Sequence, residues 1–81
     1  MNDEPLELAA VEGWGPEFVG EYATEADVEA EVRHWGAPVR TAAAVYLVGP
    51  AAGPFYDRRI TLAADGTLTW ERLQRPERKP W

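Results

Sequence analysis

Residues 60–70 of this 81-residue chain read ITLAADGTLTW, and they decide the fold of its second half. Apolar and polar side chains alternate on both sides of an Asp-Gly pair, which is the pattern of a β-hairpin. A two-residue turn would set apolar side chains opposite polar ones on one face. A three-residue loop, 64–66, sorts both faces and requires Gly66 in the left-handed conformation. This register predicts the cross-strand pairs Leu62–Leu68, Ile60–Trp70, Thr61–Thr69 and Arg59–Glu71.

The segment before this hairpin supplies a third strand. Its residues are small or branched and apolar, and the loop 49–54, which is rich in Gly and Pro, separates it from the hairpin. We expect a three-stranded antiparallel meander over residues 40–73, with strands at 40–48, 55–63 and 67–73. Residues 74–81 are polar and interrupted by proline, so we expect a tail there.

A helix is expected over residues 24–36. Thr24 and Asp27 approximate a capping box, in which each side chain can satisfy a backbone N–H at the start of the helix. A narrow apolar stripe recurs at helical spacing in Val28, Val32 and Trp35. A glycine and then a proline follow the last of these residues, which ends the helix.

Residues 1–16 are expected to form an extended segment or loop, because prolines and glycines interrupt them. Residues 6–10 alternate in a way that permits a short strand, and residues 18–22 read as a short strand or an extended lead-in to the helix. The predicted fold is therefore a single small α+β domain. It has one helix packed on a three-stranded antiparallel meander, with an extended N-terminal segment.

The charges of the chain are distributed unevenly along the sequence. Its first 32 residues carry ten carboxylates and neither lysine nor arginine, whereas residues 33–81 hold all eight basic residues and four carboxylates. Natural surfaces usually intersperse the two signs. A field of one sign steers association with a partner of the opposite sign. With a net charge of −6, the chain is expected to bind a basic partner.

The residue types needed for common catalytic mechanisms are missing. The chain has no serine and no cysteine, which excludes both as nucleophiles. The single histidine, His34, falls in the last turn of the expected helix, where a positive charge suits the helix dipole. No cluster of metal ligands and no phosphate-binding glycine motif occurs. We expect no enzyme activity, no catalytic residue, no metal and no cofactor.

The sequence also bears on location and on the basic tail. The start of the chain has no secretory signal, and the longest apolar run, residues 42–48, is far shorter than the roughly 20 residues of a membrane helix. We expect a cytoplasmic protein with no membrane partner. The basic residues near the C-terminus could form a nucleic-acid-binding arm. Alternatively they solubilise the tail or complement the acidic segment within the molecule, which the negative net charge favours.

Two interpretations of the acidic segment stay open. Its carboxylates could form a solvated face that also matches the helix dipole. Alternatively they could meet a basic partner, because carboxylates four residues apart on a helix lie roughly 6 Å apart, close to the phosphate spacing of one nucleic-acid strand. In that case two exposed rows, Glu25/Glu29 and Asp27/Glu31, would flank the apolar stripe. The predicted partner-binding residues are Glu12, Trp14, Glu17, Glu21, Glu25, Asp27, Glu29, Glu31 and Trp81.

In size, charge and lack of catalytic residues, the chain is similar to small acidic inhibitors from phages and mobile elements. That class includes anti-CRISPR, anti-restriction and DNA-mimic proteins, and the immunity proteins of basic nucleases share these properties. The similarity implies a non-enzymatic inhibitor that occupies the basic surface of a nucleic-acid-processing protein, without binding nucleic acid itself. The alternative is an accessory subunit of a larger assembly, docked through Trp14, the loop 49–54 and the tail that ends at Trp81.

Overall fold

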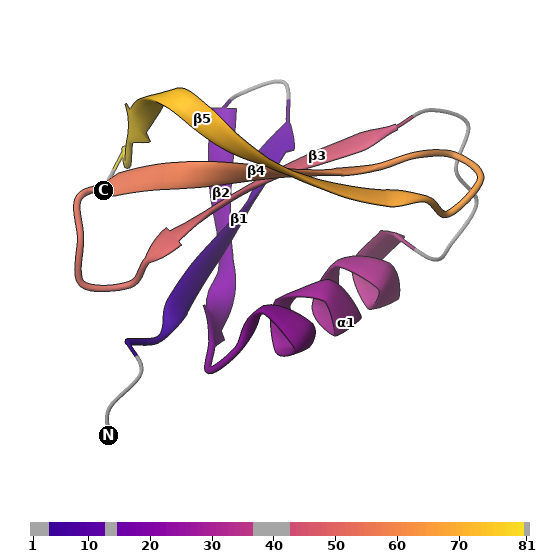
Figure 1. Cartoon of the computed structure of the whole chain (residues 1–81), viewed down its shortest axis with the longest axis horizontal. Coiled ribbons are helices and arrows are strands. Elements are labelled where there is room, and N and C mark those ends of the chain that lie inside the picture. Colours follow the sequence, from indigo (N-terminus) through magenta and orange to yellow (C-terminus); the bar gives the residue numbers. More distant parts are fainter. Residues whose placement is uncertain (1–3, 13–14, 37–42, 81) are drawn as a thin grey trace.

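The computed structural model describes residues 4–12, 15–36 and 43–80. These residues form five strands in one antiparallel sheet, and a helix lies against one face of that sheet (Figure 1). The strand order is β2-β1-β3-β4-β5, so the first two strands of the chain lie at one side of the sheet and the last two at the other. The elements are β1 Leu6–Glu12, β2 Gly15–Tyr22, α1 Glu25–Gly36, β3 Ala44–Pro50, β4 Phe55–Leu62 and β5 Leu68–Arg78.

The predicted fold is wrong about the N-terminal segment. A meander of three strands is present as β3, β4 and β5, but β1 and β2 extend the sheet instead of forming an extended segment beside it. The strand β1 pairs with β2 on one side and with β3 on the other, where Leu8 lies opposite Val48. Leu8 and Ala9, which are adjacent in sequence, are both fully buried. Because successive side chains of a strand point to opposite faces, β1 is buried on both faces of the sheet.

The hairpin prediction is confirmed. All four predicted cross-strand pairs between β4 and β5 are present. Gly66 adopts a φ of 96°, which favours glycine over residues with a side chain. The Asp65 carboxylate closes the loop by accepting a hydrogen bond from the Thr67 N–H at 2.9 Å. This hydrogen bond stabilises the charged form and holds the pKa of Asp65 below its usual value.

The helix begins at the residue that the capping pattern predicts. The Asp27 N–H donates a hydrogen bond of 3.1 Å to Thr24 Oγ1, as expected for an N-cap. Val28 and Val32 are fully buried against Leu8, Ile60 and other apolar residues of the sheet. The side chain of Trp35 lies outside the described residues. The helix thus covers apolar side chains on one face of the sheet.

The expected tail belongs to the fold for most of its length. The strand β5 continues to Arg78, and its register with β4 changes between the pairs Arg58–Arg72 and Tyr56–Glu77. The change inserts three more residues on β5 than on β4, so β5 bends there (Figure 1). A second apolar cluster of Ala9, Leu47, Tyr56 and Leu73 is thereby buried on the face away from α1.

Candidate functional site

The charge asymmetry of the sequence becomes an asymmetry in space. The first 32 residues build β1, β2 and most of α1, and β2 is an outer strand of the sheet. The described arginines and the lysine lie on β4, on β5 or directly after β5, with the exception of Arg33. The side chain of Arg33 reaches the loop between β4 and β5, where its Nη1 donates a hydrogen bond of 3.0 Å to the Gly66 carbonyl oxygen. The basic side chains therefore gather away from β2.

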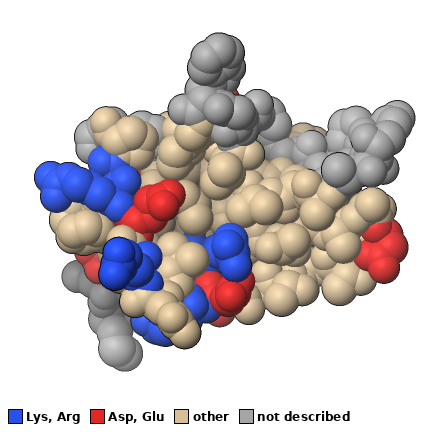
Figure 2. Space-filling model, turned by 90° about the horizontal axis from the view of Figure 1, so that it is seen from above, with Lys and Arg blue, Asp and Glu red and all other residues tan. Residues whose placement is uncertain are grey.

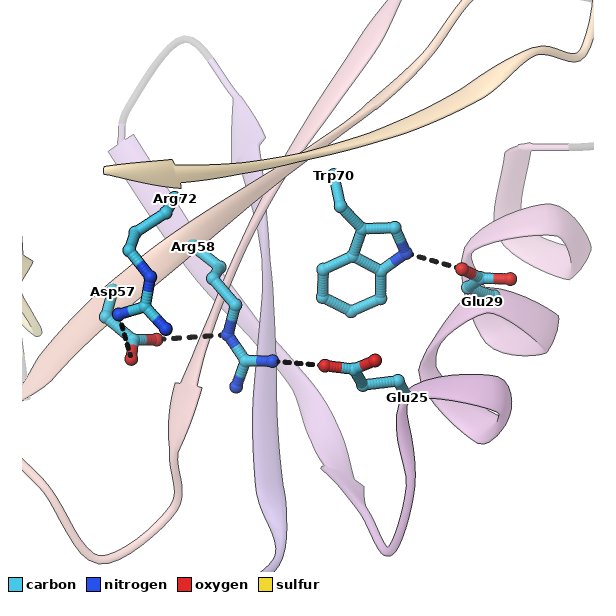
Figure 3. A network of polar contacts seen from close by, with 6 residues as sticks. All are labelled: Glu25, Glu29, Asp57, Arg58, Trp70 and Arg72. Carbon is cyan, nitrogen blue, oxygen red and sulfur yellow. Dashed lines mark hydrogen bonds and ion pairs between the residues drawn. The ribbon is translucent and has the colours of Figure 1, made fainter. Parts of the chain in front are cut away.

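One of the two predicted carboxylate rows makes contacts with the sheet of the same chain. Glu25 and Glu29, called here the inner row, turn toward the sheet (Figure 3). The Glu25 carboxylate lies 2.6 Å from Arg58 Nη1, and Glu29 accepts a hydrogen bond from the indole N–H of Trp70. Glu25 stays largely exposed but is ion-paired. Both carboxylates thus have contacts within the chain, and their predicted role in partner binding stays a prediction.

The alternation of β4 explains the position of the inner row's partner. Arg58 has the same parity as Ile60 and Leu62, so its side chain leaves β4 on the face that α1 covers. Its guanidinium lies 5.6 Å from the centre of the Trp70 ring, and its Nε lies 3.3 Å from Asp57 Oδ1. A charged side chain on this face is most stable beside a carboxylate, and the inner row supplies one.

The second row, Asp27 and Glu31, is called here the outer row and lies on the other flank of the helix. At about 100° per residue, Glu25 and Glu29 fall on one side of the buried Val28, while the outer row falls on the opposite side. Burial and then the charge of Glu31 raise the pKa of the Tyr22 hydroxyl in β2. The outer row therefore faces the β2 side of the molecule.

The strand β2 adds two exposed carboxylates to this side. Glu17 lies opposite Ala10, whereas Glu21 lies opposite Glu7, because a register irregularity separates the two pairs. They therefore project from the two faces of the same outer strand. Phe18 lies between them and is 51% exposed. We call the following set the acidic edge: Glu17, Glu21, Asp27 and Glu31.

The acidic edge is suited to contacts through side chains. Pro16 and charged residues on an outer strand discourage the addition of another strand.

Three other predicted partner-binding residues cannot be assigned to the acidic edge. The side chain of Glu12 and the whole of Trp14 and Trp81 lie outside the described residues, so their predicted roles stay predictions.

A buried polar cluster was not predicted from the sequence. Lys79 Nζ lies 3.1 Å from Glu7 Oε1 and 2.8 Å from the Pro50 carbonyl oxygen, while the Tyr56 hydroxyl donates to Glu7 Oε2 at 2.9 Å. Burial, followed by the hydrogen bond to Glu7, raises the pKa of Tyr56. The cluster joins the end of β5 to β1. One basic residue of the expected tail thus complements the acidic segment within the molecule.

Searches of the described residues for a metal site and for a membrane-spanning helix found neither. Within residues 4–12, 15–36 and 43–80, no group of three or more histidine, cysteine or acidic side chains could hold a metal ion. His34 is exposed near the end of α1. None of the helices in these same ranges has the length and apolarity to cross a membrane.

Known proteins do not identify the chain. No protein-family model, no curated protein and no solved structure matches it. A functional proposal for this chain therefore rests on the charges and the geometry of its own surface.

Proposed function

We propose that this chain is a non-enzymatic binding protein of the cytoplasm that places its acidic edge in the basic, nucleic-acid-binding surface of a partner protein and thereby inhibits it. The observation that carries the proposal is the separation of charge across the sheet. Carboxylates line the β2 side, and the described basic side chains belong to the β4 and β5 side. A potential of one sign along an edge steers a basic partner to that edge.

The spacing of the carboxylates supports contact with a phosphate-binding groove. Asp27 and Glu31 are one helical turn apart, roughly 6 Å, which resembles the phosphate spacing of a nucleic-acid strand. Glu17 and Glu21 lie opposite β1 residues that are three positions apart, about 10 Å, and they place negative charge on both faces of β2. Phe18 lies between them as a half-exposed aromatic side chain that can anchor the contact.

The proposal is tested by capture from a bacterial lysate at low salt with the tagged full-length chain. Bound proteins are then released with about 0.5 M salt or with excess duplex DNA, and are identified by mass spectrometry. We expect basic, nucleic-acid-processing proteins that both treatments release. Salt removes the screened charge contacts, and DNA competes for the same surface of the partner.

Matched variants show whether the acidic edge makes the contact. Glu17→Gln/Glu21→Gln removes two charges from the acidic edge, and Glu71→Gln/Glu77→Gln removes two from β5. Exposed charge contacts contribute about 0.2–1 kcal/mol each, so the first variant should weaken capture roughly tenfold. The second should bind like the parent chain. Equal losses in both variants, or a partner that DNA does not displace, would contradict the proposal.

A second candidate function is an accessory subunit of a larger assembly. It is favoured by two apolar side chains of the sheet face away from α1, Phe18 and Val11, which are 51% and 39% exposed. A subunit held by such side chains would keep its partner at high salt. Capture of a salt-resistant partner of ordinary charge would support this alternative over inhibition.

A further inference from the structure

Lys79 differs from the other basic residues of the chain. Its side chain is 4% exposed, and it is the one buried basic residue in the part of the chain that the structure describes. The described arginines are all at least partly exposed. On the side of the molecule away from α1, Lys and Arg side chains gather toward one end (Figure 2). The other seven basic residues of the chain are arginines, so its single lysine stands where a basic side chain is buried.

The ammonium group of Lys79 is surrounded by oxygen atoms. Its Nζ donates to the Pro50 carbonyl oxygen at 2.8 Å, to the Ala51 carbonyl oxygen at 3.3 Å and to Glu7 Oε1 at 3.1 Å. The centre of the Tyr56 ring lies 5.4 Å from the same nitrogen, within the range of a cation–π contact. Three hydrogen bonds match the three N–H donors of an ammonium group. The surroundings therefore satisfy both the charge and the donors of a primary ammonium.

The two carbonyl acceptors are held by parts of the fold other than the C-terminal segment. Pro50 ends β3, pairs with Leu6 of β1, and also accepts a hydrogen bond of 3.1 Å from the Gly53 N–H. The Ala51 N–H donates to the Pro5 carbonyl oxygen at 2.9 Å. These contacts orient both carbonyl groups through β1, β3 and the loop after β3. The occupant, in contrast, comes from the end of β5.

The carboxylate of the site is oriented as well. The Tyr56 hydroxyl donates to Glu7 Oε2 at 2.9 Å, so the two carboxylate oxygens have different partners. Tyr56 is fully buried, and Glu7 is 5% exposed. A carboxylate in such surroundings requires a compensating positive charge. Its position therefore favours a cation beside Oε1.

The donors and acceptors of the site distinguish between kinds of cation. An ammonium group is compact and has three donors, whereas a guanidinium is larger, planar and has five. In a buried site a guanidinium would need more volume and would leave donors without acceptors. A quaternary ammonium keeps the charge and the aromatic contact but has no N–H, so both carbonyl groups would lose their donor. The choice of lysine at position 79, in a chain otherwise rich in arginine, agrees with this selectivity.

We propose that Glu7, Tyr56 and the carbonyl groups of Pro50 and Ala51 form a binding site for a primary alkylammonium group, which Lys79 fills as an internal ligand. The ligand class comprises alkylammonium ions and lysine side chains. In the intact chain Lys79 excludes them, because a tethered group has a high effective concentration. Once the side chain of Lys79 is removed, the site accepts an alkylammonium ion from solution.

The first test uses the full-length Lys79→Ala variant. The substitution keeps Cβ and removes the rest of the side chain, which n-propylammonium matches. At about 50 mM this probe should raise the Tm of the variant by about 5 °C and bind with a dissociation constant of about 1–10 mM. Methylguanidinium and tetramethylammonium at the same concentration should do neither. The parent chain, whose site is filled, should not respond, and Glu7→Gln/Lys79→Ala should weaken binding at least tenfold.

A second variant tests the selectivity even if Lys79→Ala does not fold. The chain has no cysteine, so Lys79→Cys introduces a single thiol, whose thiolate displaces bromide from an alkylating reagent in urea. With 2-bromoethylamine the new side chain has the length of lysine and ends in a primary ammonium. With (2-bromoethyl)trimethylammonium it ends in a quaternary one. After refolding, the first form should melt within about 2 °C of the parent chain, and the second at least about 10 °C lower. The same two modifications at Arg78→Cys, an exposed position, should not differ.

Equal melting temperatures of the two forms modified at position 79 would overturn the proposal, because charge alone would then suffice. A folded Lys79→Ala that propylammonium does not stabilise, or that tetramethylammonium stabilises equally, would also overturn it. If Lys79→Ala is unfolded with and without the probe, the two alkylated forms decide the question. The site shares no residue with the acidic edge. Its failure would therefore leave the proposed partner binding untouched, and the two results are separable.

Discussion

At the scale of single residues, the fold uses part of the acidic segment for its own contacts. Glu7 is 5% exposed and binds both Lys79 and Tyr56. Glu25 pairs with Arg58. The distribution of charges along the sequence does not reveal which carboxylates have such partners within the chain. The sequence shows that Lys79 is the single lysine beside seven arginines. It does not show that Lys79 is buried, because Glu7 and Lys79 are far apart in sequence. In addition, Glu7 alternates with the apolar residues Leu6 and Leu8, which suggests that its side chain faces solvent.

We expect Lys79→Met to destabilise the fold by about 3 kcal/mol, because loss of one member of a buried ion pair leaves the other charge uncompensated. The measurement is the free energy of unfolding in urea. The neighbouring Arg78→Met removes an exposed charge of the same kind and should cost less than about 0.5 kcal/mol. Glu7→Gln/Lys79→Met should recover part of the loss. Equal stability of both single variants would show that the buried pair contributes little.

At the scale of elements, locally encoded structure was predictable and distant pairing was not. The β4–β5 hairpin and the start of α1 follow from nearby residues, namely the loop around Gly66 and the cap at Thr24. The strands β1 and β2 were not placed in the sheet, because β1 pairs with a strand some 40 residues later. No local pattern reports such a pair. The bend of β5 after Arg72 was missed for the same reason.

Gly49 of β3 lies very close to the backbone of β4. A Cβ at this position of β3 would lie 2.8 Å from Tyr56 Cα and still closer to the Phe55 carbonyl oxygen, so backbone would have to shift. We expect Gly49→Ala to lower the free energy of unfolding by about 1–3 kcal/mol. In Gly53→Ala the new Cβ meets its nearest atom at 3.7 Å, an ordinary contact, and stability should be retained. A harmless Gly49→Ala would contradict this close approach.

At the scale of the whole molecule, the order of charges along the chain becomes an order across the sheet. The sequence predicts the asymmetry itself, because all basic residues follow residue 32. It does not predict that the two parts occupy opposite sides, which depends on the strand order β2-β1-β3-β4-β5. Nor does it predict that Glu25 and Glu29 turn toward the basic side, whereas Asp27 and Glu31 remain with the acidic edge.

The most direct measurement of the central claim is an NMR titration of the ¹⁵N-labelled chain with an arginine-rich peptide at low salt. The account predicts that the largest amide shifts occur along β2 and around Asp27 and Glu31. The inner row, already paired with Arg58 and Trp70, should respond less. These shifts should disappear in Glu17→Gln/Glu21→Gln. Shifts spread evenly over all carboxylates, or centred on Glu71 and Glu77 of β5, would contradict a binding surface at the acidic edge.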